Sequence, residues 1–173
     1  LFTVQASEKV YADYRLEITD KGGHSSLARP DNPIYTLAGA LQRIAGHQFP
    51  LNLTDVARVF FERSALVETG QLAADMRAVS QPRPDADAVA RLSAIPFYNA
   101  RLRTTCVATQ LEAGHAPNAL PQMARANVNC RIYPDQTVED VRQDLERVIA
   151  DPAVKVTALE IRGPMAKAPP LTP

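Results

Sequence analysis

Two polar loops carry the side chains best suited to chemistry in this sequence. One is residues 22–26 (GGHSS), with His24 at its centre, and the other is residues 118–121 (NALP), which begins at Asn118. Arg131 follows on the polar side of the next predicted strand. A histidine on a rigid turn can donate a hydrogen bond to a developing negative oxygen, and an arginine offers a planar fork for a carboxylate. Taken singly, each residue is better explained as part of a turn or of a solvated sheet face.

The sequence shows no recognisable metal centre or activated nucleophile. Its histidines, His24, His47 and His115, form no His-x-x-x-His or His-x-Asp pair, and there is no Cys-x-x-Cys. A zinc site needs three or four convergent ligands, so we expect none in this chain. Ser25 and Ser26 adjoin His24, but a nucleophile and its base are brought together in space rather than as sequence neighbours. Neither Gly-x-Ser-x-Gly nor a phosphate-binding glycine loop is present.

The composition is that of a globular domain without a strong charge preference. The chain has 173 residues, of which 46% are apolar and 22% charged, and 19 basic residues balance 19 acidic ones. Because the net charge is zero, we expect neither nucleic acid nor a membrane surface as a partner. No apolar run reaches the length of about 18 residues that a transmembrane helix needs.

The elements that must position these loops form a predicted α+β fold. Helix signals begin at Asn32, an N-cap followed by proline, and at Thr137, where Asp140 completes a capping box. The first of these helices covers residues 33–46. Alternating apolar residues predict strands at 8–20, 103–113, 122–133 and 154–161. The resulting β-α-β-β-α-β order is ferredoxin-like, with two helices on one face of a four-stranded antiparallel sheet in the order 4-1-3-2.

Residues 49–102 interrupt this order and are expected to form a helical insertion. Short helices are predicted at 53–63, 71–79 and 85–92. The ferredoxin-like core would then consist of residues 8–48 and 103–162. The proline-rich residues 163–173 are expected to be a linker to a catalytic domain. Because the chain also begins without an initiator methionine, we expect residues 1–173 to be a single domain of a longer protein.

In combination, these motifs resemble the lid, or dimerisation, domain of the M20 family of metallopeptidases. The resemblance comprises the Gly-Gly-His-Ser-Ser turn after the first strand, the Asn-Ala-Leu-Pro loop, and Arg131 before Pro134, in that order. The insertion, together with residues 103–105 (RTT) and 129–134 (NCRIYP), looks closest to the carboxypeptidase S-like branch. One departure is the Ala-Gly-His segment at 113–115, where the family often has Gly-Gly.

This resemblance implies a role within a larger hydrolase. Family members add a catalytic domain that holds one or two zinc or other divalent ions and a general-base glutamate, and they hydrolyse peptides, N-acyl amino acids or related amides. By resemblance, His24 is a catalytic residue that stabilises the transition state, often in the partner subunit. Asn118 and Arg131 would bind the substrate and its carboxylate. The zinc ligands are expected outside this chain, which alone would be inactive.

An unpaired edge strand predicts self-association. We expect a homodimer through the strand at 103–113 and the first helix, because a free edge can pair with a second copy. Two alternatives stay open: a free-standing ferredoxin-like regulatory or small-ligand-binding module, and a purely structural oligomerisation domain. Whether the insertion covers the active site or extends the dimer interface is also open.

The two cysteines are predicted to be free thiols. Cys106 and Cys130 lie on the two strands of one hairpin. A register that pairs Val107 with Val128 keeps apolar side chains toward the helices, buries Cys130 and puts Cys106 on the opposite face. The register one residue along would oppose the cysteines but would set Gln110 on the core side, unless a β-bulge intervened.

Overall fold

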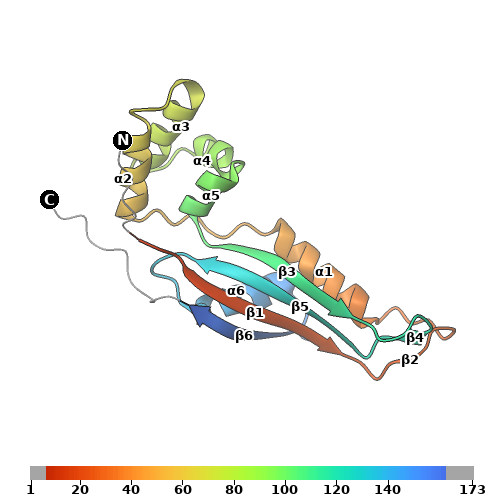
Figure 1. The fold of residues 1–173 in the computed structure, drawn as a ribbon. Coiled ribbons are helices and arrows are strands. Elements are labelled where there is room, and N and C mark those ends of the chain that lie inside the picture. The colour runs from red at the N-terminus through yellow and green to blue at the C-terminus, as the bar shows by residue number, and fades with distance from the viewer. Residues whose placement is uncertain (1–6, 163–173) are drawn as a thin grey trace.

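The structure, a computed structural model, describes residues 7–162 and consists of a long sheet with a bundle of short helices at one end (Figure 1). The predictions for residues 163–173 lie outside the described residues. In chain order the elements are β1 (Val10–Thr19), β2 (Gly23–His24), α1 (Pro33–Gly46), α2 (Asp55–Ser64), α3 (Gly70–Ser80), α4 (Ala86–Ser93), α5 (Pro96–Leu102), β3 (Thr105–Ala113), β4 (Ala119–Leu120), β5 (Met123–Ile132), α6 (Val138–Ile149) and β6 (Lys155–Arg162).

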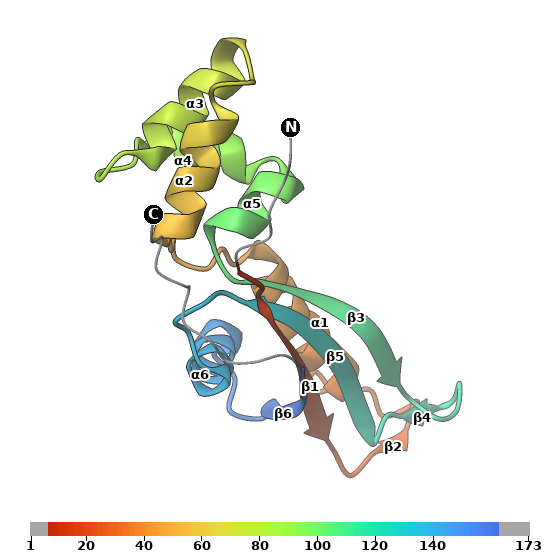
Figure 2. The same ribbon diagram turned by 60° about the vertical axis from the view of Figure 1, so that its left-hand side comes forward.

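The main sheet has four strands in the order β3-β5-β1-β6, with antiparallel pairing throughout. This is the predicted order 4-1-3-2 read from the other edge, so the ferredoxin-like prediction is confirmed. Helices α1 and α6 lie side by side on one face, and the opposite face carries no helix of the described chain (Figures 1 and 2). β3 and β6 form the two edges.

The core lies between the sheet and these two helices. Alternate residues of β1, from Val10 to Ile18, are buried because successive side chains of a strand point to opposite faces. They meet the buried residues Leu37 and Ile44 of α1 and Leu145 of α6. The predicted caps are present: the Asn32 side chain accepts from Ile34 N–H, and Thr137 and Asp140 form the capping box.

The insertion has a hydrophobic core of its own. Its buried residues are Phe61, Ala65, Met76, Val79, Ala88, Leu92 and Leu102. The three predicted helices are present with slightly different bounds, and α5 is an additional seven-residue helix that the sequence analysis missed. The insertion leaves the core after α1 and returns to it at β3. It therefore stands at the end of the sheet where β1 begins (Figure 1).

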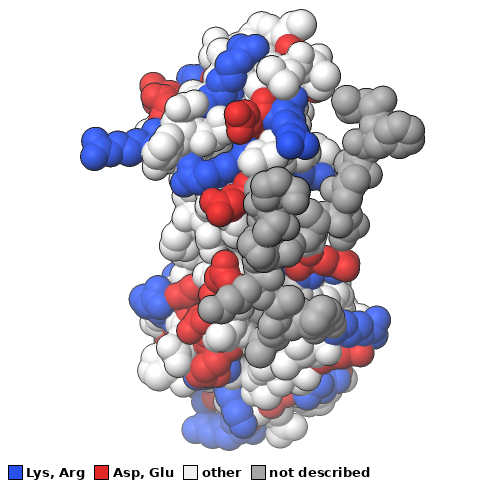
Figure 3. Space-filling model, turned by 90° about the vertical axis from the view of Figure 1, so that its left-hand side faces the viewer, with Lys and Arg blue, Asp and Glu red and all other residues white. Residues whose placement is uncertain are grey.

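Charged side chains of both signs are intermixed over the surface of the insertion and the core (Figure 3). On the side shown, the described residues present no extended surface of one sign, as the balance of 19 basic and 19 acidic residues leads one to expect. Within residues 7–162, none of the helices combines the length and the apolar character needed to cross a membrane.

The prediction of two free thiols is wrong, and so is the placement of Cys106 on the face opposite the helices, whereas Cys130 lies in the core as predicted. Cys106 lies directly opposite Cys130, with Cα atoms 4.1 Å apart, and a disulfide joins them. A β-bulge midway along the β3–β5 pair then shifts the register, so that Leu111 rather than Gln110 lies opposite Ala126. Because of the bulge, the cysteines lie opposite each other before it, and Gln110 need not point into the core after it. Both cysteines consequently contact the core on the helix side of the sheet.

Candidate functional site

A short ladder between β2 and β4 brings the two predicted loops together. His24 lies opposite Ala119, and the next residue, Ser25, donates its backbone N–H to the carbonyl of Asn118 at 3.0 Å. The sequence analysis predicted both loops but not their pairing, since strands of two residues have no periodicity to detect. His24 and Asn118 are therefore neighbours, at the end of the sheet far from the insertion (Figure 1).

The turn that carries His24 is held from several sides. Gly22 has a φ of 72°, and a Cβ there would lie 2.7 Å from a side-chain carbon of Gln122, so the position suits glycine alone. The N–H of Gly22 donates to the Asp20 carboxylate at 2.8 Å, and Arg29 forms an ion pair with the same carboxylate. These two contacts hold the pKa of Asp20 below its usual value. The turn is thus a rigid support for the histidine.

Ser26 determines which nitrogen of His24 can donate. The backbone N–H of Ser26 donates to Nδ1 at 3.2 Å, and the Ser26 Oγ lies 2.8 Å from the same nitrogen. A neutral imidazole has one acceptor and one donor nitrogen. Because Nδ1 accepts from a backbone amide, the proton of the neutral ring is on Nε2. The exposed His24 side chain therefore presents an N–H donor to whatever approaches it.

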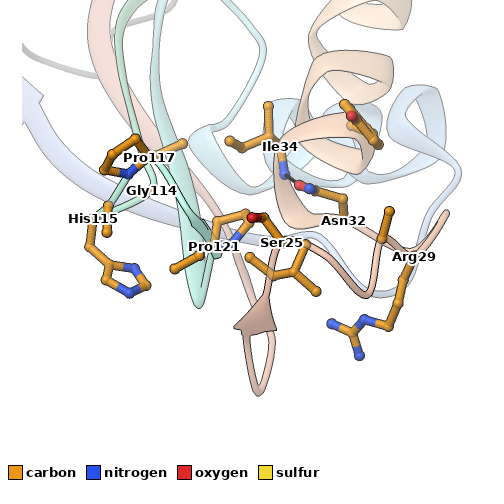
Figure 4. A pocket seen from close by; sticks show the side chains of 14 residues that line it. Ser25, Arg29, Asn32, Ile34, Gly114, His115, Pro117 and Pro121 are labelled. Carbon is orange, nitrogen blue, oxygen red and sulfur yellow. Dashed lines mark hydrogen bonds between the residues drawn. The ribbon is translucent and has the colours of Figure 1, made fainter.

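An open pocket of about 750 Å³ adjoins the paired loops. It lies between the loop before β4, which supplies His115 and Pro117, and the start of α1, where Asn32 and Arg29 lie (Figure 4). Ser25 links this pocket to the histidine turn. The pocket has enough space for a small ligand and is lined in part by polar side chains. Its lining includes no carboxylate and no cysteine.

Arg131 lies at the other end of the sheet. It sits on β5 opposite Tyr11, and its guanidinium is 4.8 Å from the centroid of the Tyr11 ring. Met123, at the start of β5, pairs with Thr19, from which the chain turns toward His24. The stretch of β5 from Met123 to Arg131 spans about 26 Å at the usual rise of a strand. Within one chain, the structure does not bring Arg131 together with His24 and Asn118.

At this end of the sheet, the sequence analysis missed the contacts of the Lys9 side chain and of the Arg101 backbone carbonyl. Lys9 Nζ donates to the carbonyl of Arg103 at 2.5 Å and lies 5.6 Å from the centroid of the Tyr133 ring. The carbonyl of Arg101, on α5, accepts from the Tyr133 hydroxyl at 2.8 Å. Because Arg101 belongs to the insertion, its approach to the sheet is a long-range contact that no local pattern could reveal.

The described residues do not fit a metal centre. Within residues 7–162, no group of three or more His, Cys, Asp or Glu is placed to hold a metal ion. A zinc ion needs such convergent ligands. The described residues supply a histidine side chain, His24, on one loop and the positive charges of Lys9 and Arg131 at the other end of the sheet.

Comparison with known proteins places these observations in context. The family model described as "Peptidase dimerisation domain", that of M20 enzymes, matches residues 6–157. The human N-fatty-acyl-amino acid synthase/hydrolase PM20D1 is 28% identical over 172 residues, which cover 96% of this chain and 33% of that protein. A probable carboxypeptidase S-like protein 2 of Dictyostelium discoideum is 29% identical over 160 residues, covering 91% of this chain and 30% of that protein. The chain thus spans about a third of the length of these relatives.

A solved structure shares the fold. The M20 family metallo-carboxypeptidase Sso-CP2 from Sulfolobus solfataricus superimposes with a TM-score of 0.52 and 18% sequence identity. The match covers 88% of this chain and 43% of that one. The ferredoxin-like core and its insertion therefore have a counterpart in a solved structure.

Proposed function

Because the chain belongs to the peptidase dimerisation domain family of M20 enzymes, we propose that it is the lid and dimerisation domain of a metal-dependent amide hydrolase. The relatives favour a carboxypeptidase or an N-acyl-amino-acid hydrolase, since their names state these activities. In this proposal the zinc ligands and the general base come from a part of the parent protein outside this chain. The chain's own residues bind and orient the substrate.

The contact between the Ser26 N–H and Nδ1 of His24 is the observation that supports the catalytic role. Hydrolysis of an amide converts its carbonyl oxygen into a negatively charged oxygen in the transition state. A preorganised donor stabilises that charge more than it stabilises the neutral carbonyl. With the Ser26 N–H on Nδ1, His24 can offer its Nε2–H as such a donor. We propose that Asn118, whose carbonyl accepts from the backbone N–H of Ser25 beside the histidine, contacts the same substrate.

The position of Arg131 supports an active site shared by two subunits. Arg131 lies about 26 Å along the β5 backbone from Met123, at the end of the sheet near His24, which is too far for both side chains to contact one small substrate. We propose that His24 and Asn118 reach into the partner's active site. Arg131 then binds the carboxylate of the substrate held by its own subunit.

The exposed edge of the sheet supports this pairing. On β3, the side chains of Val107 and Leu111 are 60% and 66% exposed, although both are apolar. Tyr35, on the neighbouring helix α1, is 66% exposed. A second copy that pairs along β3 would bury these side chains and satisfy the free backbone groups of the edge. We propose the homodimer contact there.

Substitution of His24 in the full-length parent tests the catalytic role. We expect His24→Ala to lower kcat by about 10²–10³-fold, the usual effect of removing one oxyanion donor, with an unchanged melting temperature. His47→Ala is the matched control, because His47 follows the end of α1, lies outside the pocket lining and has no proposed role. Turnover close to that of the wild type in His24→Ala would overturn the assignment. It would favour the purely structural oligomerisation domain instead.

A further inference from the structure

The insertion presents two large apolar side chains to solvent around the start of α5. Ile95 and Phe97 are 40% and 55% exposed. The Arg101 side chain holds Phe97 in place, because its guanidinium carbon lies 3.6 Å from the centroid of the Phe97 ring and it donates to the Phe97 carbonyl at 2.7 Å. We call Ile95 and Phe97 the α5 patch. An ordered aromatic side chain of this kind is a common anchor of protein–protein interfaces.

The pocket beside the paired loops has apolar walls that face solvent. Its apolar lining includes Ile34 and Tyr35 at the start of α1 and Pro117, Leu120 and Pro121 around β4 (Figure 4). Ile34 and Tyr35 are themselves exposed. Exposed apolar side chains that gather around an open pocket of about 750 Å³ favour the binding of an apolar group from another molecule. The pocket is therefore suited to an aromatic ring.

The α5 patch and the pocket lie at opposite ends of β3. Helix α5 ends at Leu102, just before β3 begins at Thr105, whereas the last residue of β3, Ala113, lines the pocket. The strand spans about 26 Å between Thr105 and Ala113 at the usual rise of a strand. This separation keeps the patch away from the pocket of its own chain.

Antiparallel pairing of two β3 strands brings the patch of one subunit to the pocket of the other. A two-fold axis through the middle of β3 places Thr105 of one subunit beside Ala113 of its partner, with about 4.8 Å between the strands. The partner's insertion then stands next to the pocket. Helix α1, which carries Ile34 and Tyr35, contacts β3 and therefore lies along the same edge. The symmetry produces this contact twice in each dimer.

We propose that the pocket binds the α5 patch of the partner subunit, with the Phe97 ring as the anchoring side chain. This inference rests on the proposed function, in which two subunits pair along β3. The dimer interface then consists of the strand pair at its centre and an insertion-in-pocket contact at each end. Because Ser25 also lines the pocket, the bound insertion would stabilise the turn that carries His24. The insertion is thereby assigned to the dimer interface.

Photo-crosslinking in the full-length parent tests this contact directly. The photoreactive residue p-benzoylphenylalanine, placed at position 97, reacts with C–H groups beside it on irradiation. We expect covalent dimers in which residue 97 is joined to residues 113–121 or to the start of α1 of the other subunit. The same replacement at Leu66 is the control, because Leu66 is an exposed apolar residue in the loop between α2 and α3 of the same insertion. Crosslinks from position 97 that stay within one subunit would overturn the proposal.

The dissociation constant of the dimer gives the companion measurement. We expect Phe97→Ala to raise it by about ten- to a hundredfold in sedimentation equilibrium, without a change in melting temperature, since the ring lies on the surface. Tyr35→Ala, which removes a wall of the pocket, should act in the same direction. If the two side chains meet, the double variant should lose less than the product of the two single effects. Leu66→Ala should dissociate at the wild-type concentration.

A variant of the strand itself separates this inference from the proposed dimer. Val107→Lys places a charge on the β3 edge and should yield a monomer if the strands pair there. If Val107→Lys is monomeric while Phe97→Ala dimerises as tightly as the wild type does, the strand contact stands and the pocket contact fails. A wild-type parent that stays monomeric at high concentration would overturn the proposed dimer, and the pocket contact with it.

Discussion

In the proposed function, Arg131 contributes a positive charge and His24 contributes a hydrogen-bond donor. Arg131 can hold a carboxylate through two parallel N–H···O bonds, which gives both energy and orientation. A substitution by Met keeps much of the aliphatic stem but removes the guanidinium fork, which lies 4.8 Å from the centroid of the Tyr11 ring. We therefore expect Arg131→Met in the full-length parent to raise KM for a free-acid substrate by about ten- to a hundredfold and to change kcat much less.

The matched control for this substitution is Arg125→Met. Arg125 occupies the same face of β5, but Glu112 holds it through bonds of 2.7 and 3.0 Å. It should leave KM close to the wild-type value. Comparing a free-acid substrate with its amide completes the experiment: an equal loss for both would contradict carboxylate recognition by Arg131.

For single residues, the sequence indicated which loops carry functional side chains, but it did not indicate which residues come together in space. His24 and Asn118 stand in recognisable loop motifs, but the backbone bond through Ser25 that makes them neighbours was not predicted. Lys9 could not be identified in the same way. Its environment depends on Arg101, more than 90 residues away in the chain, and on the aromatic ring of Tyr133.

Among the elements, the β3–β5 pair gives the clearest stability prediction. The disulfide between Cys106 and Cys130 closes a loop with a sequence separation of 24 residues. By the chain-entropy estimate, such a cross-link stabilises the folded state by about 3 kcal/mol. We expect urea unfolding of the reduced chain to show a free energy of unfolding lower by that amount.

The control for the disulfide is the double variant Cys106→Ala/Cys130→Ala. Its unfolding curve should be the same with and without reductant, since it has no bond to break. Superimposable curves for the oxidised and the reduced wild-type chain would show that the disulfide contributes nothing to stability.

The elements also show why the long strands were predictable and the register was not. β1 and β5 alternate without interruption, so one buried face can be read directly from the sequence. β3 is mostly exposed and contains a bulge, which makes its apolar residues change face midway. An argument from uninterrupted alternation therefore separated Cys106 from Cys130. The short helix α5 has too few residues to show a helical period.

For the whole molecule, the separation of His24 from Arg131 predicts complementation between two defective subunits, measured at a substrate concentration well below the wild-type KM. If His24 acts in the partner's site, a dimer of one His24→Ala subunit and one Arg131→Met subunit contains one intact site and one site with both defects. Random pairing makes half of the dimers mixed, so co-expressed variants should recover about a quarter of the wild-type activity.

The controls are the two single variants, each expressed alone. The homodimers that they form should keep the low activity of the single variant. Activity that stays at the level of the single variants after co-expression, with mixed dimers demonstrated by two different affinity tags, would show that each site uses residues of one subunit. In that case the proposed sharing between subunits fails, although the lid assignment does not depend on it.

The disulfide anchors the first residues of β3 to β5, whereas no covalent bond holds the last residues of β3. Cys106 is the second residue of β3, beside the insertion, so the ladder with β5 can fray only from the far end, near Ala113. Amide hydrogen exchange should accordingly quicken along β3 from the disulfide toward the loops of His24 and Asn118. A second copy that pairs with this edge would bind first to the half of β3 that carries the disulfide. The half of β3 that ends at Ala113, near the loops of His24 and Asn118, would pair last. Completion of the shared site would then be a late step of dimer assembly.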